Sequence, residues 1–269
     1  MRFVCAFLAF ALVFGSISAV VILKHNDVSL KEIFGGKEET TETESMKNNV
    51  VELPKEIGGE TNYLLYSADS EMSEIYFIAL VNADMDDKIF KVRALDTSDT
   101  SYLSELKTGG CKALVSAVEK KENIEIKKYA GSTADTFALA INYMGGLEYS
   151  INKRIEYRTE DFTLILTKGE QTIKGETLLK YFRYAKTLGD DGLELQGQLI
   201  CTMLDNYINS DNLEKGLTIY QKLLSKINTN SDISYIDAAG MIDTLKVYCK
   251  SEEKQPAEVV TLPKEEEVQ

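Results

Sequence analysis

The sequence predicts an α/β layered fold that follows a single N-terminal transmembrane helix. Two observations support this. Strand-like and helix-like segments alternate between residues 61 and 250, and residues 3–23 form one long uncharged, mostly apolar run. Glutamate-rich segments flank the part that is predicted to fold. We therefore expect a membrane anchor, a flexible acidic spacer, an α/β domain and a disordered acidic tail, at 1–25, 26–60, 61–250 and 251–269 respectively.

The first 25 residues indicate where in the cell the protein is located. Arg2 is followed by 21 uncharged residues, Phe3 to Leu23, and then by Lys24. A helix needs roughly 20 apolar residues to cross the hydrocarbon core, so this run is long enough to remain as an anchor. A cleaved signal peptide is the alternative, because small residues lie near 16–19. Arg2 favours a cytoplasmic N-terminus, so we expect a single-pass protein of the cytoplasmic membrane with an extracytoplasmic domain.

Charge and composition exclude several kinds of site. The net charge is −13, of which residues 36–60 (three Lys, seven Glu) and 251–269 (two Lys, six Glu) contribute −4 each. The rest of the chain is only mildly acidic, and without a basic patch we expect no nucleic-acid partner. The single histidine, His25, lies beside the predicted anchor, which excludes histidine-based catalysis in the folded domain. Three cysteines follow the anchor without a Cys-x-x-Cys pair, and we expect small buried residues there.

The first half of the domain is predicted to be rich in strands. Residues 62–67 and 75–84 hold many aromatic and branched side chains, as buried strands do. Residues 88–95 alternate after the turn "DMDD" and complete a hairpin with the preceding strand. A pair of glycines opens a helix at 109–123, whose apolar residues recur at helical spacing, and 124–130 is the next strand.

The second half is predicted to be mainly helical. Thr133 is a candidate N-cap for a helix that ends at Gly145 and Gly146. A glycine-marked turn at 168–175 leads into a helix that ends near Ala185. Between these helices, branched and aromatic residues predict three short strands, at 147–151, 154–158 and 162–166. Apolar residues at helical spacing predict three further helices, at about 190–208, 211–226 and 234–249.

One short stretch, "LLKYFRYAKTLGDDG" at 178–192, suggests chemistry. A helix that carries Arg183 breaks at Gly189 and is followed by two adjacent carboxylates, Asp190 and Asp191. An arginine near paired carboxylates is either part of a surface ion pair or part of a site that handles phosphate. The stretch alone leaves both interpretations open.

Four stretches follow one another along the chain: "NYLLYSADSEMSEIYFIALVNAD" at 62–84, "VRALDTSDT" at 92–100, the segment 106–151 with its two Gly-Gly pairs, and "LTKGEQTIKGETLLKYFRYAKTLGDDGLELQGQLICTML" at 166–204. In this order they resemble the LytR-CpsA-Psr (LCP) family of bacterial cell-envelope proteins. The resemblance implies a layered α-β-α sandwich around a central mixed sheet, with a tunnel for a polyprenyl lipid. It also implies transfer of a glycopolymer phosphate from a lipid carrier to peptidoglycan, helped by Mg²⁺.

The resemblance assigns roles to residues on two loops and two helices. The catalytic positions are Arg183, Asp190 and Asp191. The lipid pyrophosphate would be held by Arg183 together with Lys186 and Gln198. The positions that resemble metal ligands are Asp69, Glu74 and Asp96. The implied partners are the membrane, a polyprenyl-phosphate lipid, and a cell-wall polymer or a related envelope protein.

Most of the arginines that the family uses for phosphate are absent from this sequence. Their positions are occupied by Leu95, Ala185, Leu193 and Gln196. Removing one preorganised donor typically lowers the rate by about 10²–10³, so several losses together leave little catalysis. We therefore expect a degenerate LCP-like domain that binds a lipid or an envelope partner. The alternatives are an active phosphotransferase with rearranged cations, and an interaction module that binds no lipid.

Overall fold

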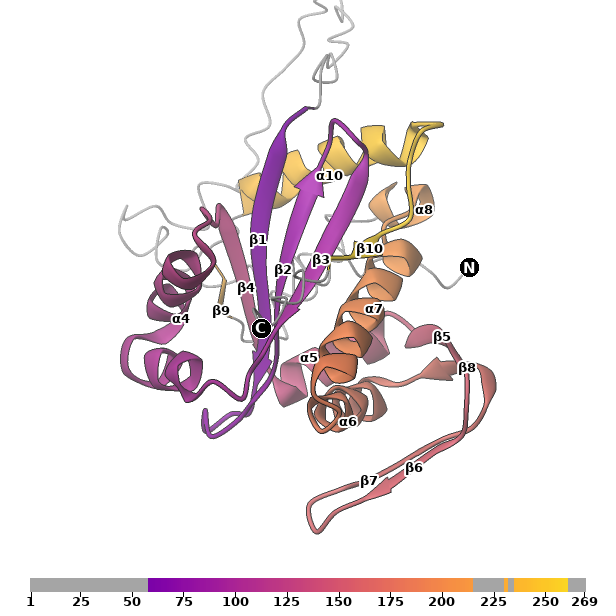
Figure 1. The fold of residues 1–269 in the computed structure, drawn as a ribbon. Helices are drawn as coiled ribbons and strands as arrows, with labels where there is room; N and C mark the ends of the chain where they lie inside the picture. Colours follow the sequence, from indigo (N-terminus) through magenta and orange to yellow (C-terminus); the bar gives the residue numbers. More distant parts are fainter. Residues whose placement is uncertain (1–57, 215–229, 232–234, 261–269) are drawn as a thin grey trace, which may run out of the picture.

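A central mixed sheet organises the domain. The computed structural model describes residues 58–214, 230–231 and 235–260. In that part of the chain a six-stranded sheet has the strand order β10-β3-β2-β1-β4-β9 (Figure 1). Strands β1, β2 and β3 are successively antiparallel, whereas β1 pairs with β4, and β3 with β10, in parallel. The six strands are β1 (Glu60–Ala68), β2 (Ile75–Asp84), β3 (Ile89–Leu95), β4 (Lys128–Thr133), β9 (Asn230–Ser231) and β10 (Glu258–Val259).

Helices cover both faces of this sheet, so the predicted α-β-α layering is confirmed (Figure 1). Helix α4 packs on one face, where Leu64, Ile78 and Leu114 are fully buried. The other helices pack on the opposite face in a larger cluster around Phe77 and Phe182. The helices are α4 (Thr100–Glu122), α5 (Ala134–Tyr143), α6 (Gly175–Lys186), α7 (Asp190–Tyr207), α8 (Ser210–Glu214) and α10 (Tyr235–Lys250).

Helix α4 begins nine residues before the predicted start at 109 (109 minus 100). Asp99 caps it, because its side chain accepts a hydrogen bond from the Ser101 N–H at 2.9 Å. The glycines that we interpreted as a helix start instead form a kink, with Gly110 at a φ of 69°. That conformation is accessible to glycine at little cost, so two helical segments join there without a loop. The following strand is also displaced, since β4 begins at Lys128 rather than 124.

A long hairpin extends away from the sheet between α5 and α6 (Figure 1). Strand β5 (Leu147–Ile151) pairs with β8 (Gly169–Ile173), and β6 (Ile155–Arg158) pairs with β7 (Thr163–Leu166). Strand β8 was predicted as part of a turn, and that prediction is wrong. Its sequence, "GEQTI", is mostly polar, and only its last residue is buried. Backbone pairing with β5, rather than burial, therefore defines this strand.

The predicted anchor, 1–25, lies outside the described residues, as does the spacer up to residue 57. Within the described ranges no helix has the length and apolar character that crossing a membrane requires. The prediction of a disordered tail from 251 is wrong for residues 251–260. Gln255 N–H donates to the Lys88 carbonyl at 3.1 Å, and β10 adds a strand to the sheet. Residues 261–269 and most of the predicted helix at 211–226 also lie outside the described part.

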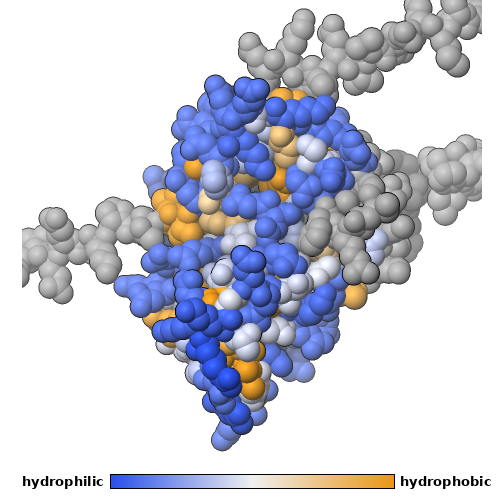
Figure 2. All heavy atoms as spheres, turned by 90° about the vertical axis from the view of Figure 1, so that its right-hand side faces the viewer, coloured by the Kyte–Doolittle hydropathy of each residue, from blue (hydrophilic) through white to orange (hydrophobic). Residues whose placement is uncertain are grey.

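The surface on the side of the hairpin is mostly hydrophilic, with separate apolar spots (Figure 2). Large apolar side chains are exposed at Leu139 and Tyr143 on α5, Ile165 on β7, Leu188 after α6, and Val260 after β10. Scattered exposed residues of this kind are ordinary on a soluble surface.

Candidate functional site

The predicted site residues come together at one end of the sheet. Strands β1 and β3 run in the same direction because both are antiparallel to β2, so their carboxyl ends share an edge. Asp69 follows β1, Glu74 precedes β2 and Asp96 follows β3. Helix α6 ends and α7 begins near this edge. The fold therefore places all the predicted loops within one region, but the side chains divide into two separate groups.

The first group is an ion cluster around Glu74. Arg183 Nε lies 3.2 Å from Glu74 Oε2, and Lys186 Nζ lies 3.1 Å from Glu74 Oε1. Lys186 also donates to the Ile75 carbonyl at 2.7 Å, and Arg183 Nη2 lies 3.6 Å from Asp161 Oδ2. Among the described residues, Arg183 thus forms its ion pairs with Glu74 on the β1–β2 loop and Asp161 on the hairpin, and not with Asp190 or Asp191. Two cations and two carboxylates balance, so the cluster presents no net positive charge to an anion.

Aromatic rings hold the guanidinium of Arg183 in place. Its Cζ lies 4.5 Å from the centre of the Phe162 ring and 5.8 Å from that of Tyr76. Burial, reinforced by the nearby Glu74 carboxylate, raises the pKa of Tyr76, so this hydroxyl stays neutral at physiological pH. Cation–π contacts and two ion pairs together fix Arg183, whose side chain is only 25% exposed.

The predicted metal ligands do not form a metal site. Asp69 accepts bonds from Ser73 Oγ and Glu74 N–H, both at 2.7 Å, and stabilises its own turn. Burial tends to raise the pKa of Asp69, but these hydrogen bonds prevail and lower it. Asp96 accepts from both the N–H and the hydroxyl of Ser98. No group of three or more His, Cys, Asp or Glu side chains suited to a metal occurs in the described ranges, so these residues do not fit Mg²⁺.

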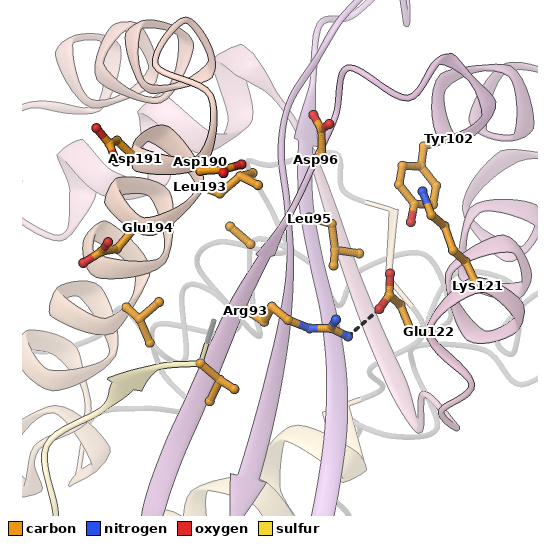
Figure 3. Close-up of a pocket in the computed structure, with 13 residues that line it drawn as sticks. Arg93, Leu95, Asp96, Tyr102, Lys121, Glu122, Asp190, Asp191, Leu193 and Glu194 are labelled. Carbon is orange, nitrogen blue, oxygen red and sulfur yellow. Dashed lines mark ion pairs between the residues drawn. The ribbon is translucent and has the colours of Figure 1, made fainter. Parts of the chain in front are cut away.

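The second group lines a pocket of about 670 Å³ between α4, the outer edge of β3 and the start of α7 (Figure 3). Leu95, Leu193 and Val259 are among its apolar residues. Carboxylates come from the end of β3 and from α7, namely Asp96, Asp190, Asp191 and Glu194. Asp190 and Asp191 also have a structural role, because negative charges in the first turn favour a helix whose cap, Gly189, provides no side chain.

The cations of this pocket are already paired. Arg93 Nη2 lies 2.6 Å from Glu122 Oε2, and Figure 3 shows its guanidinium directed toward α4, away from the carboxylates of α7. Lys121 Nζ lies 2.7 Å from Asp99 Oδ2 and 4.9 Å from the centre of the Tyr102 ring. The hydrogen bond from Lys121, with those from Ser101, lowers the pKa of Asp99, which therefore remains charged. The pocket is acidic at its rim and offers no unpaired cation from its lining.

Comparison with known proteins decides the family. The sequence model of the LytR_cpsA_psr family matches residues 85–269, more than half of the chain. The chain belongs to this family.

Solved structures support the LCP fold. A protein of Eubacterium siraeum has a TM-score of 0.60 at 14% identity and covers 83% of this chain and 89% of its own. TagV of B. subtilis has a TM-score of 0.57 at 18% identity, covering 77% and 86%. The protein gbs0355 of Streptococcus agalactiae has a TM-score of 0.59 at 16% identity, covering 76% and 77%. No curated protein matches the sequence.

The pocket contains two of the positions at which the resemblance to the LCP family predicts arginines. Leu95 and Leu193, which occupy two positions that resemble LCP arginines, both line it. Gln196 occupies a third such position, yet it is 1% exposed and donates to the backbone carbonyls of Phe182 at 3.1 Å and Tyr76 at 3.3 Å. Sequence reasoning missed this tether between α7, α6 and β2. Its helical spacing from the apolar residues at 199, 200 and 203 was the available signal.

Gln198 does not contribute to the pocket as predicted. It is exposed on α7 and donates to Glu194 Oε1 at 3.0 Å, one turn earlier.

The LCP lipid tunnel remains a prediction. Between β2 and helices α5 and α6, the space is occupied by three packed rings. Phe77 stacks on Phe182 at 4.5 Å between centres, and Phe137 meets Phe77 edge-on at 5.6 Å.

Proposed function

We propose that the chain is a membrane-anchored, extracytoplasmic LCP domain that binds a polyprenyl-phosphate lipid or another envelope partner without efficient glycopolymer transfer. The observation that carries this proposal is the charge of the pocket. Five carboxylates line it, and its two cations, Arg93 and Lys121, each have a carboxylate partner within 3 Å. The rim therefore lacks the unpaired positive charge that the transfer of a pyrophosphate-linked group requires.

The loss of catalysis follows from the chemistry of the transfer. Cleaving a pyrophosphate places additional negative charge on the bridging oxygen, and preorganised donors must meet that charge. The leucines at 95 and 193 provide no hydrogen-bond donor, and Arg93 already forms an ion pair with Glu122. Each missing donor lowers the rate by about 10²–10³-fold. The absence of two guanidinium groups therefore already removes most of the acceleration.

Binding of a lipid or of another envelope molecule requires less of the site than catalysis does. The apolar lining formed by Leu95, Leu193 and Val259 needs no arginine to contact an apolar group. Family membership supports a cell-envelope role, and the predicted anchor would keep the domain at the membrane surface. Protease accessibility in spheroplasts tests this location, since an extracytoplasmic domain is digested without lysis.

The function is tested with the full-length chain purified in detergent. Lipid extracts of the purified protein are analysed by mass spectrometry for polyprenyl phosphate. In parallel, the protein is incubated with a lipid-linked glycopolymer, peptidoglycan and Mg²⁺. We expect bound polyprenyl phosphate, and turnover at least about 10³-fold below that of an active LCP protein in the same assay. Turnover comparable to that of the active protein would contradict the proposal. Absence of both lipid and turnover would favour an interaction module.

One observation favours the active phosphotransferase as a second candidate. Arg183 and Lys186 converge on Glu74, so two cations already lie close together at the carboxyl edge of the sheet. If a substrate phosphate displaced Glu74, both cations would be available to it. This candidate predicts measurable turnover that Arg183→Gln abolishes, whereas the degenerate domain shows no turnover for the substitution to reduce.

A further inference from the structure

A strap of residues 251–260 lies along the outer edge of β3. It follows α10 directly and includes β10. Figure 1 shows β10 between β3 and α7, and the strand contacts both elements. None of the residues 251–260 is buried, so the strap contributes little to the core of the domain.

Polar contacts, rather than buried side chains, hold the strap in place. The Val260 N–H donates to the Val92 carbonyl on β3 at 2.8 Å. The Ala257 N–H donates to Asp205 Oδ1 on α7 at 2.9 Å, in an exposed hydrogen bond. Water replaces such bonds when they break, so each contributes little net free energy. The strap can therefore lift without exposing a buried side chain of its own.

Helix α7 presents a narrow stripe to the strap. Leu193, Gly197 and Asp205 are separated by multiples of four residues, so they lie on one face of the helix. A Cβ added at Gly197 would lie 2.8 Å from Val259 Cγ1, which means that the glycine provides the room in which the strap sits. Leu193 lines the pocket together with Val259. The stripe thus leads from beneath the strap into the pocket.

The strap contributes only apolar side chains to the pocket. They are Val259 and Val260, and Val260 is 39% exposed. Elsewhere the rim carries the carboxylates of β3 and α7, whose bound water an apolar chain would have to displace. An apolar chain therefore meets the smallest desolvation cost on the side of the strap. Lifting the strap removes this wall and joins the pocket to the space along α7.

We propose that the strap is a gate, which lifts from β3 and α7 to admit an apolar chain into the pocket and then closes over it. The identity of the ligand, a polyprenyl phosphate, rests on the proposed function, whereas the movement rests on the contacts of the strap. Closing restores the two residue pairs with β3 and retains the ligand. The connection to α10 keeps the open strap close to its site.

Hydrogen exchange in the full-length chain without ligand tests whether the strap lifts as a unit. The Ala257 and Val260 amides are the probes, because they donate to different elements, α7 and β3. If one movement breaks both bonds, their protection factors agree within about threefold and lie well below those of the interior strand β2. A larger difference between the two amides, or protection equal to that of β2, would overturn the proposal.

A wedge beneath the strap sharpens this test. Gly197→Ala places a methyl group against Val259 and should lower both protection factors about tenfold, because crowding destabilises the closed strap more than the open one. Gly240→Ala is the matched control, since Gly240 is also helical but an added Cβ there meets nothing within 4 Å. An effect on only one of the two amides, or equal effects of the two substitutions, would contradict the movement.

A disulfide between β3 and β10 tests the gate itself. Lys91 and Glu258 are partners in the register, and neighbouring strands lie about 4.7–4.9 Å apart, within the range that a disulfide spans. The full-length Lys91→Cys, Glu258→Cys chain is purified in detergent. Stopped-flow fluorescence then measures the association of a fluorescent farnesyl phosphate analogue with its oxidised and reduced forms.

We expect association to be at least about tenfold slower in the oxidised form, because the strap cannot lift. The reduced form is the control, since it carries the same two substitutions. A smaller difference would overturn the gate. If the analogue associates with neither form, the proposed lipid binding fails, and the exchange of the Ala257 and Val260 amides alone decides whether the strap lifts.

Discussion

Replacing Glu74 by glutamine tests the ion cluster at the carboxyl edge of the sheet. The substitution keeps the size of the side chain and removes the charge that holds Arg183 at 3.2 Å and Lys186 at 3.1 Å. The three side chains are 23–31% exposed, so solvent screens each pair, and the two together stabilise the fold by about 1–2 kcal/mol. For a domain of this size that loss lowers Tm by about 2–8 °C.

The same substitution releases two cations for an anion. We expect Glu74→Gln to bind inorganic pyrophosphate about tenfold more tightly than the wild type, because a charge-assisted hydrogen bond contributes about 1.5–3 kcal/mol before competing costs. Isothermal titration calorimetry measures the affinity, and differential scanning calorimetry measures Tm. The stability difference should shrink in about 1 M salt, where the Debye length is near 3 Å.

Glu71→Gln is the matched control for this prediction. Glu71 lies in the same loop, is exposed and makes none of the ion pairs found around Glu74. It removes the same charge and should change neither Tm nor pyrophosphate affinity measurably. If Glu71→Gln and Glu74→Gln bind pyrophosphate equally, general charge rather than release of the cluster explains the effect, and the reasoning is refuted.

Three further changes test other parts of the fold and site. Phe182→Ala removes a fully buried ring from the aromatic cluster and should lower the free energy of unfolding by about 3–5 kcal/mol in urea denaturation; a loss below about 1 kcal/mol would contradict close packing there. Leu193→Arg adds a guanidinium to the acidic pocket and should tighten pyrophosphate binding about tenfold by calorimetry; unchanged affinity would contradict the charge argument. The Asp87 N–H and the Lys91 ammonium lower the pKa of buried Asp84. The wild type should therefore lose stability as pH falls below about 4, and Asp84→Asn should flatten that part of the curve while lowering stability at pH 7; parallel curves would be the contrary result.

Strongly patterned elements were predictable from the sequence. Residues 75–84 are almost continuously apolar and form the interior strand β2, which is buried along nearly its whole length. Thr133 caps α5 as predicted, since its hydroxyl accepts from the Thr136 N–H at 3.3 Å. In both cases local side-chain chemistry and tertiary context favour the same structure, and a pattern of a few residues is then sufficient.

Elements that depend on distant partners were not predictable. Strand β10 is a two-residue segment in a Glu-rich stretch, and only its pairing with β3, more than 160 residues earlier (258 minus 91), makes it a strand. Arg183 was assigned to the nearby Asp190 and Asp191 because proximity in sequence was the only guide. Its carboxylate, Glu74, comes from a loop 109 residues away (183 minus 74). The identity of a site residue was therefore easier to predict than its partner.

The position of β1 in the sheet has a mechanical consequence. This strand comes directly after residues 1–57, and it is an interior strand with nine residue pairs to β2 and six to β4. Tension transmitted along the chain from the N-terminal side would pull β1 lengthwise against both neighbours at once, so that many backbone bonds share the load in shear. An edge strand with two residue pairs, as β10 has in the described residues, would instead detach as its backbone hydrogen bonds break one after another. A domain tethered through its first residues is thus held by an interior strand that is paired on both sides.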